Sequence, residues 1–223
     1  MGIFNLFGKR TPRVEVLTPV EYTVKIQYPS VLEYTMTVSR MKVEDDHQIF
    51  FQFDRGEVMV NGDAASDYLA ADLAAQCGQV LYPLQVSVAT GGSITGIFNH
   101  PEILKRWTEK EPRLQEYFAG PGATEYISAT GKALQDEGAV LRALQQDLFL
   151  TCWCNLATGG KRTAYQLVPF REPVPYEHDI QFTVNKLTKM IDTITAEWHF
   201  EQDGSPRRTQ LTAVCNPIKA TVV

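Results

Sequence analysis

The chain has 223 residues, of which 44% are hydrophobic, so it is long and apolar enough for one large domain with a sizeable core. Its net charge of −5 argues against nucleic acid as a partner, because such binding depends on Lys and Arg side chains that neutralise phosphates. The apolar runs fall short of the roughly 18 residues that a membrane span needs, so we expect no stable membrane insertion.

The first 13 residues differ in composition from the rest of the chain. They combine an apolar run with three basic residues and no acid, which fits neither a solvated tail nor a strand. Because the basic residues follow the apolar run, the segment does not have the order of a signal peptide. We predict an exposed arm over residues 1–13 that docks a protein partner, ahead of packing on its own domain or lying weakly on a membrane surface. The candidate partner-binding residues are Ile3, Phe4, Leu6, Phe7, Lys9 and Arg10.

Residues 14–60 have the pattern of β-strands. Branched and aromatic side chains recur at every second position, as on half-buried strands. Turn-forming residues interrupt this pattern at 18–19, 28–30, 44–46 and 54–56, so we predict four or five antiparallel strands.

The next segment carries most of the negative charge and then a helix. Between residues 44 and 72 eight acids stand against the single base Arg55, which predicts a charge-polarised surface. Asn61-Gly62-Asp63 precedes a predicted helix of about 15 residues with one apolar side. That side carries Leu69, Leu73, Cys77, Val80 and Leu81.

A hairpin and a second helix form the centre of the chain. Alternating apolar residues over 84–97 flank Gly91-Gly92, which supplies the positive φ angles of a hairpin turn. The helix that follows has a capping-box spacing at Asn99 and Glu102, and Trp107 falls on its inward side. Pro112 should kink or split this helix. Further helix is predicted over 124–149, with Gly131 and Gly138 as weak points that divide it.

The last third returns to strands. We predict strands over 150–156, 164–170, 180–184 and 190–200, where the last could be helical by spacing but has the Thr and Ile content of a strand. Asp203-Gly204 should join it as a hairpin to the alternating residues 211–215. Strands, helices and strands in this order predict a single α+β domain over residues 14–223, with a mainly antiparallel sheet and helices on one face.

The candidate chemistry is sparse. Four scattered cysteines indicate reduced thiols and a cytoplasmic protein. Cys152 and Cys154 on a strand would share one face, and we favour buried structural cysteines over a zinc site completed by Cys77 and Cys215. His100 is better explained by the helix start than as a catalytic base. We therefore predict no catalytic residue, no metal and no cofactor.

Three functions compete. The leading one is a non-catalytic interaction protein, such as an adaptor, inhibitor or accessory subunit, that docks a protein partner through the arm and the charge-polarised surface. The alternative is a carrier that binds an apolar small molecule or lipid between an aromatic sheet and its helices, with Phe51, Phe53 and Trp107 as ligand-binding residues. An enzyme that uses His100 as its base is third.

Overall fold

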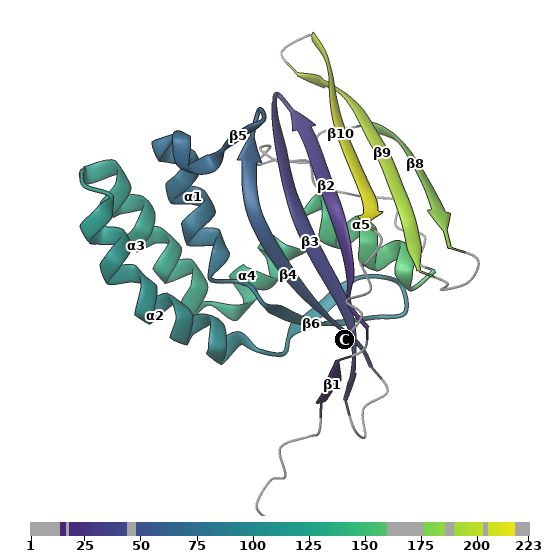
Figure 1. Cartoon of the computed structure of the whole chain (residues 1–223), viewed down its shortest axis with the longest axis horizontal. Coiled ribbons are helices and arrows are strands. Elements are labelled where there is room, and N and C mark those ends of the chain that lie inside the picture. The colour runs from purple at the N-terminus through teal and green to yellow at the C-terminus, as the bar shows by residue number, and fades with distance from the viewer. Residues whose placement is uncertain are drawn as a thin grey trace, which may run out of the picture.

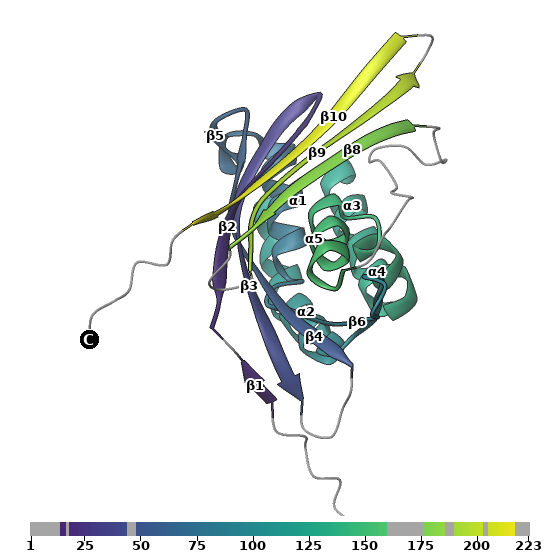
Figure 2. The same ribbon diagram turned by 90° about the vertical axis from the view of Figure 1, so that its right-hand side faces the viewer.

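One antiparallel sheet runs through the molecule and carries the helices on one of its faces (Figures 1 and 2). The structure is a computed structural model that describes residues 14–16, 18–43, 48–159, 176–185, 190–202 and 205–216. In these residues the strand order is β7-β6-β4-β3-β2-β10-β9-β8, with β1 paired to β3 and β5 paired to β4. The strands are β1 Val14–Val16, β2 Val20–Tyr28, β3 Ser30–Val43, β4 Ile49–Val60, β5 Asp63–Ala64, β6 Leu84–Val88, β7 Ile94–Ile97, β8 Tyr176–Val184, β9 Ile191–Gln202 and β10 Ser205–Asn216. The helices are α1 Leu69–Gln79, α2 His100–Tyr117, α3 Pro121–Gln135, α4 Glu137–Leu144 and α5 Leu148–Ala157, with a short 3-10 turn at Ala65–Asp67. The predicted fold class, α+β with a mainly antiparallel sheet and helices on one face, is confirmed.

The first strands follow the predicted alternation, with one correction. The β2–β3 hairpin turns at the expected Tyr28 to Ser30. The turn expected at residues 54–56 is wrong, because β4 runs through it without a break. Between the pairs Tyr34–Val58 and Met36–Arg55, β4 has one residue more than β3, so a β-bulge accommodates the turn-like sequence.

The helix α1 is shorter than predicted. It ends at Gln79, and Leu69 at its start is 70% exposed, whereas Leu73 and Cys77 face the core as expected. The first two residues of the helix, Leu69 and Ala70, are therefore exposed, while Asp72 in the same turn is buried.

The helix α2 is continuous across Pro112, so the predicted split is wrong. Trp107 and Leu114 on either side of the proline are both buried, and this shared packing holds the two halves in one helix. The predicted weak points in the following helical region are also misplaced. The break between α3 and α4 falls at Asp136, which has an extended backbone, while Gly131 lies buried inside α3.

The expected strand over 150–156 is wrong, because this segment forms α5. The side chain of Asp147 caps the helix by accepting a hydrogen bond from the Leu150 N–H at 2.8 Å. Short apolar runs have the same pattern in a buried helix and a buried strand, so periodicity did not distinguish them. The segment 164–170 lies outside the described residues.

The C-terminal strands confirm the predictions for 180–184 and 190–200. β9 pairs with β8 on one side and with β10 on the other, and the β9–β10 hairpin joins at the predicted place. The last described strand lies beside one of the first, because β10 also pairs with β2.

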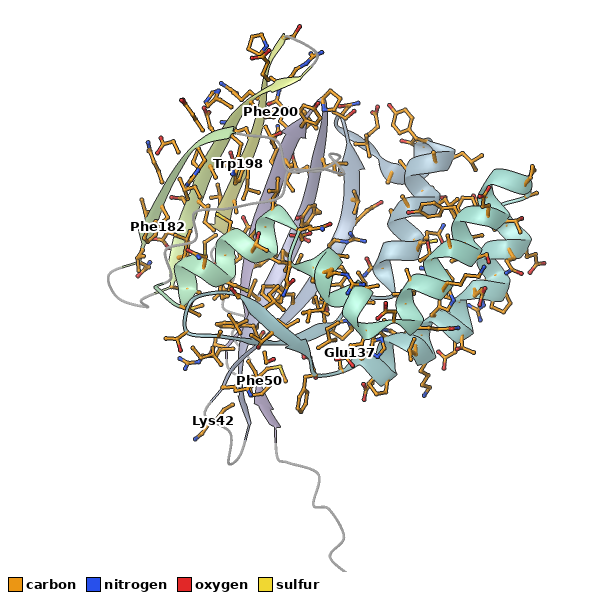
Figure 3. All side chains as sticks on the ribbon, turned by 180° about the vertical axis from the view of Figure 1, so that it is seen from behind. Lys42, Phe50, Glu137, Phe182, Trp198 and Phe200 are labelled. Atoms are coloured by element: carbon orange, nitrogen blue, oxygen red, sulfur yellow. The ribbon has the colours of Figure 1, made fainter. Side chains whose placement is uncertain are left out.

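The two faces of the sheet differ in character. On the helix-covered face, Tyr22, Phe51 and Phe53 pack edge-on or tilted against Trp153 of α5. The opposite face carries mainly Thr, Gln and charged residues, with a small apolar cluster where Phe50 meets Met41 and Phe98. Figure 3 shows Phe50 at the end of the sheet from which β1 projects. Phe50 and Phe51 therefore lie on opposite faces, as the strand pattern predicts.

Candidate functional site

The residues predicted for partner binding, Ile3, Phe4, Leu6, Phe7, Lys9 and Arg10, lie outside the described residues. Those predicted for an apolar ligand lie in the core. Phe51, Phe53 and Trp107 are 5%, 0% and 4% exposed. The two phenylalanines pack against Trp153, and Trp107 lies against Gly131 of α3. None of the three lines the grooves described below.

The predicted capping box at the start of α2 does not form. Asn99 occupies the N-cap position, but its side chain accepts from the Gln85 N–H at 2.9 Å and donates to the Pro83 carbonyl at 2.8 Å. These bonds attach α2 to β6 instead of capping it. The neighbouring His100 donates through Nε2 to the Leu134 carbonyl at 2.8 Å, which ties the start of α2 to the end of α3.

The cysteines do not form the strand pair that was expected. Cys152 and Cys154 lie on α5, and both are buried because this helix is enclosed by protein. None of the four cysteines forms a disulfide in the described part of the chain, and burial raises the pKa of Cys154, Cys77 and Cys215. Among the residues that the structure describes, no three His, Cys, Asp or Glu side chains are arranged to hold a metal ion.

A feature that could receive a ligand is a groove of about 650 Å³ between α1 and α2, which we call the basic groove. It combines three cations and one carboxylate with two glutamines and two tyrosines. Its lining residues are Gln76, Gln79, Val80, Tyr82, Arg106, Glu109, Lys110, Arg113, Leu114 and Tyr117.

One cation of the basic groove has a structural role. The guanidinium of Arg106 donates to the carbonyls of Val80 and Leu81, at 2.8 and 3.3 Å, just beyond the end of α1. A cation at this end of a helix offsets the partial negative charge of its last carbonyls. Arg106 therefore fastens α2 to the C-terminus of α1 and fixes the width of the groove.

The other two cations have no such partner. None of the ion pairs or hydrogen bonds found in the described part of the chain uses the charged groups of Lys110 or Arg113. Lys110 is half-buried, and this burial lowers the pKa of its ammonium. Asp72 favours the charged form, but it is not in ion-pair contact with the ammonium and is itself bonded to Gln76. These two charges are available to an incoming group.

A second groove, of about 350 Å³, is apolar and is also lined by α1. It lies about one helical turn closer to the start of α1 than the basic groove does. Leu69 and Leu73 line it from α1, and Gln76 and Val80 of the basic groove follow on the same stripe of the helix. The other residues that line this apolar groove are Ala70, Phe118, Ala119, Gly122, Ala123 and Tyr126. The rim is exposed: Leu69 is 70% and Tyr126 46% exposed, and Tyr117 of the basic groove is 69% exposed.

This site was missed in the sequence, although part of its signal was readable. Arg106, Lys110 and Arg113 are spaced by four and three residues, which places them on one side of a helix. What the sequence did not indicate is that α1 would lie beside that stripe, because the contact joins residues about 30 positions apart.

Comparison with protein-family models, with curated proteins and with solved structures finds no match for this chain. Within the described residues, every helix is too short or too polar to cross a membrane.

Proposed function

We propose that the chain is a non-catalytic interaction protein, an adaptor, inhibitor or accessory subunit, that docks a protein partner. The contact would involve the arm of residues 1–13 and the charge-polarised surface of the helical layer. The polarity of that surface supports this proposal. Exposed acids at Glu57, Asp63 and Asp67 precede α1, whereas the cations Lys110 and Arg113 line the basic groove, and Lys110 also reaches the hollow that Glu57 and Asp72 line.

The observation that carries the proposal is the exposed apolar rim of the two grooves. Leu69, Tyr117 and Tyr126 each expose between 46% and 70% of their surface, and they gather around hollowed surface instead of being scattered. Contiguous exposed apolar surface of this kind is typical of protein interaction sites. Ordered aromatic side chains also contribute large contact area at low entropic cost.

The competing functions have less support. A carrier that uses Phe51, Phe53 and Trp107 would need space beside these rings, and all three are packed against other side chains. For an enzyme that uses His100, Nε2 donates to the Leu134 carbonyl, so only Nδ1 could accept a proton, and the bonded ring fastens α2 to α3.

The test is quantitative co-purification with the full chain and two variants. Deletion of residues 1–11 should leave the melting temperature nearly unchanged and abolish the enrichment of the partner. The double variant Leu69→Ser/Tyr126→Ser should also lose the partner while it keeps its fold.

Val214→Ser is the matched control, because Val214 is 44% exposed on β10, away from the grooves. The proposal fails if no protein co-purifies reproducibly, or if both variants keep the same partner. A large loss of stability on deletion would instead make the arm part of the core.

A further inference from the structure

The basic groove carries positive charge on an otherwise acidic chain. Three cations line it against the single carboxylate of Glu109, whereas the whole chain has a net charge of −5. Glu109 itself is balanced by Lys105 at 4.0 Å on the outer side of α2. The groove is therefore a local positive site, which concentrates anionic groups from solution.

Stability of the fold accounts for only one of these cations. Arg106 offsets the C-terminal end of α1 and bonds to three carbonyls, including that of Pro83 at 3.2 Å. Lys110 and Arg113 lie one and two turns further along α2 and contact no such group among the described residues. The half-buried ammonium of Lys110 loses hydration in this place, and no ion pair or hydrogen bond in the described part of the chain replaces the lost water contacts. An anionic ligand would replace them.

The neutral polar groups of the groove complement a peptide backbone. The side-chain amide of Gln76 donates to Asp72 at 2.9 Å, and that of Gln79 donates to the Arg55 carbonyl at 3.0 Å. Both amide groups are thus held in place with their carbonyl oxygens left as acceptors. Backbone N–H groups of an incoming segment are donors that match such acceptors.

We propose that the basic groove binds an acidic peptide segment of the partner, with carboxylates at Lys110 and Arg113 and an apolar side chain in the groove at Leu69. This inference rests on the proposed function and adds the chemistry of the partner to it. A peptide fits better than nucleic acid, because an apolar side chain can fill the apolar groove, whereas a phosphate would lose its hydration there.

The decisive experiment selects peptides from an unbiased random library displayed on phage, with the full chain as the immobilised target. The variant Lys110→Met/Arg113→Gln removes both free charges and keeps similar side-chain length, which protects the fold. The matched control Lys132→Met/Arg207→Gln makes the same two changes at exposed positions outside the grooves. Thermal melting followed by circular dichroism establishes that both variants are folded.

The expected result is a set of acid-rich peptides that also contain Leu, Phe or Trp. Synthetic copies should bind the double variant about tenfold more weakly than the parent, by fluorescence anisotropy, and the control variant unchanged. Added salt should weaken the binding, since the charges are partly exposed.

Four outcomes would overturn the inference. The first is a set of selected peptides without acid enrichment. The second is a set of acid-rich peptides whose affinity does not change in the Lys110→Met/Arg113→Gln variant. The third is a single-stranded oligonucleotide that binds the same cations more tightly than the peptides do. If the first outcome occurs and the binding of the selected peptides is lost in the Leu69→Ser/Tyr126→Ser variant, the proposed function is still supported. A selection without any binder also refutes the acidic peptide, and the co-purification experiment then decides the proposed function separately.

Discussion

The helices α5 and α2 make opposite use of their surfaces. Eight of the ten residues of α5 are buried, including the polar Thr151 and Asn155, so this helix is enclosed by the sheet and its neighbours. α2 has 18 residues and buries only Ile103, Trp107 and Leu114 fully, which form one stripe along it. Its other sides are free to carry charge.

The difference separates the part of the molecule that holds the fold from the part that can bind. Trp153 of α5 contacts the rings of Tyr22, Phe51 and Phe53, so these contacts stabilise the fold and leave the indole buried. The charges of Lys110 and Arg113, which both lie on α2, contact no ion-pair partner in the described residues. Substitutions in α5 should therefore change stability, and substitutions on the open side of α2 should change binding.

The largest expected effect is that of Trp153→Ala. Trp153 is 2% exposed, and its removal leaves a cavity among three aromatic rings, so the free energy of unfolding should fall by about 3 to 5 kcal/mol. Trp153→Phe is the control, because Phe keeps an aromatic ring against the same three side chains and loses mainly volume. Urea denaturation measures both. A loss below about 1 kcal/mol for the alanine variant would show that α5 is not the centre of the core.

A smaller effect is expected where α2 meets α3. A Cβ on Gly131 would lie 2.8 Å from Trp107 Nε1 and 3.2 Å from Trp107 Cε2, so Gly131→Ala overpacks the inward side of α2. Despite the better helix propensity of alanine, we expect a loss of about 1 to 3 kcal/mol. Gly122→Ala is the comparison, because a Cβ there meets nothing within 4 Å. Denaturation curves that show Gly131→Ala to be as stable as Gly122→Ala would contradict the tight contact.

These two helices also differ in how far the sequence predicted them. The start and inward side of α2 follow from local patterns, such as Pro101 in its first turn and the spacing of Ile103, Trp107 and Leu114. The hairpins at residues 28–30, 91–92 and 203–204 were likewise predictable, because turn chemistry is local.

The remainder depended on contacts between distant segments. α5 is buried on all of its sides, and its short apolar run predicts a buried strand as well as it predicts a buried helix. Asn99 was expected to cap α2, but the backbone of Gln85 lies close enough to take its side chain. The basic groove forms because α1 packs beside α2, and no local sequence pattern predicts that packing.

Asp147 tests the burial of α5 through pH. Burial raises the pKa of its carboxyl, while the Leu150 N–H and the charge of Arg55 act in the opposite direction. A carboxyl with a folded pKa above its unfolded value of about 3.9 binds more protons in the folded state, so its contribution to stability falls as the pH rises through the folded pKa.

Asp147→Asn keeps the cap acceptor but not the charge, so its cost at low pH should be within about 1 kcal/mol. The stability of this variant relative to the parent should increase between pH 4 and pH 7, as measured by urea denaturation at several pH values. A relative stability that is flat or falls with pH would show that Asp147 is better stabilised as a carboxylate than its burial implies.

The smallest effect on stability is expected for Tyr117→Ser on the open side of α2. Tyr117 is 69% exposed, and the ring contact that it makes within the described residues is the edge-on pair with Phe118, at 4.8 Å between the ring centroids. Exposed substitutions of this kind usually change stability by less than about 0.5 kcal/mol, so the denaturation midpoint should stay close to that of the parent.

Binding should respond differently, because Tyr117 lies at the rim of the basic groove beside Arg113. Affinity for a selected acidic peptide should fall several-fold, and Tyr117→Phe should restore most of it if the ring and not the hydroxyl makes the contact. If neither affinity nor stability changes, Tyr117 does not belong to the binding site. If stability falls as much as it does for Gly131→Ala, the distinction between the buried and the open side of α2 is wrong.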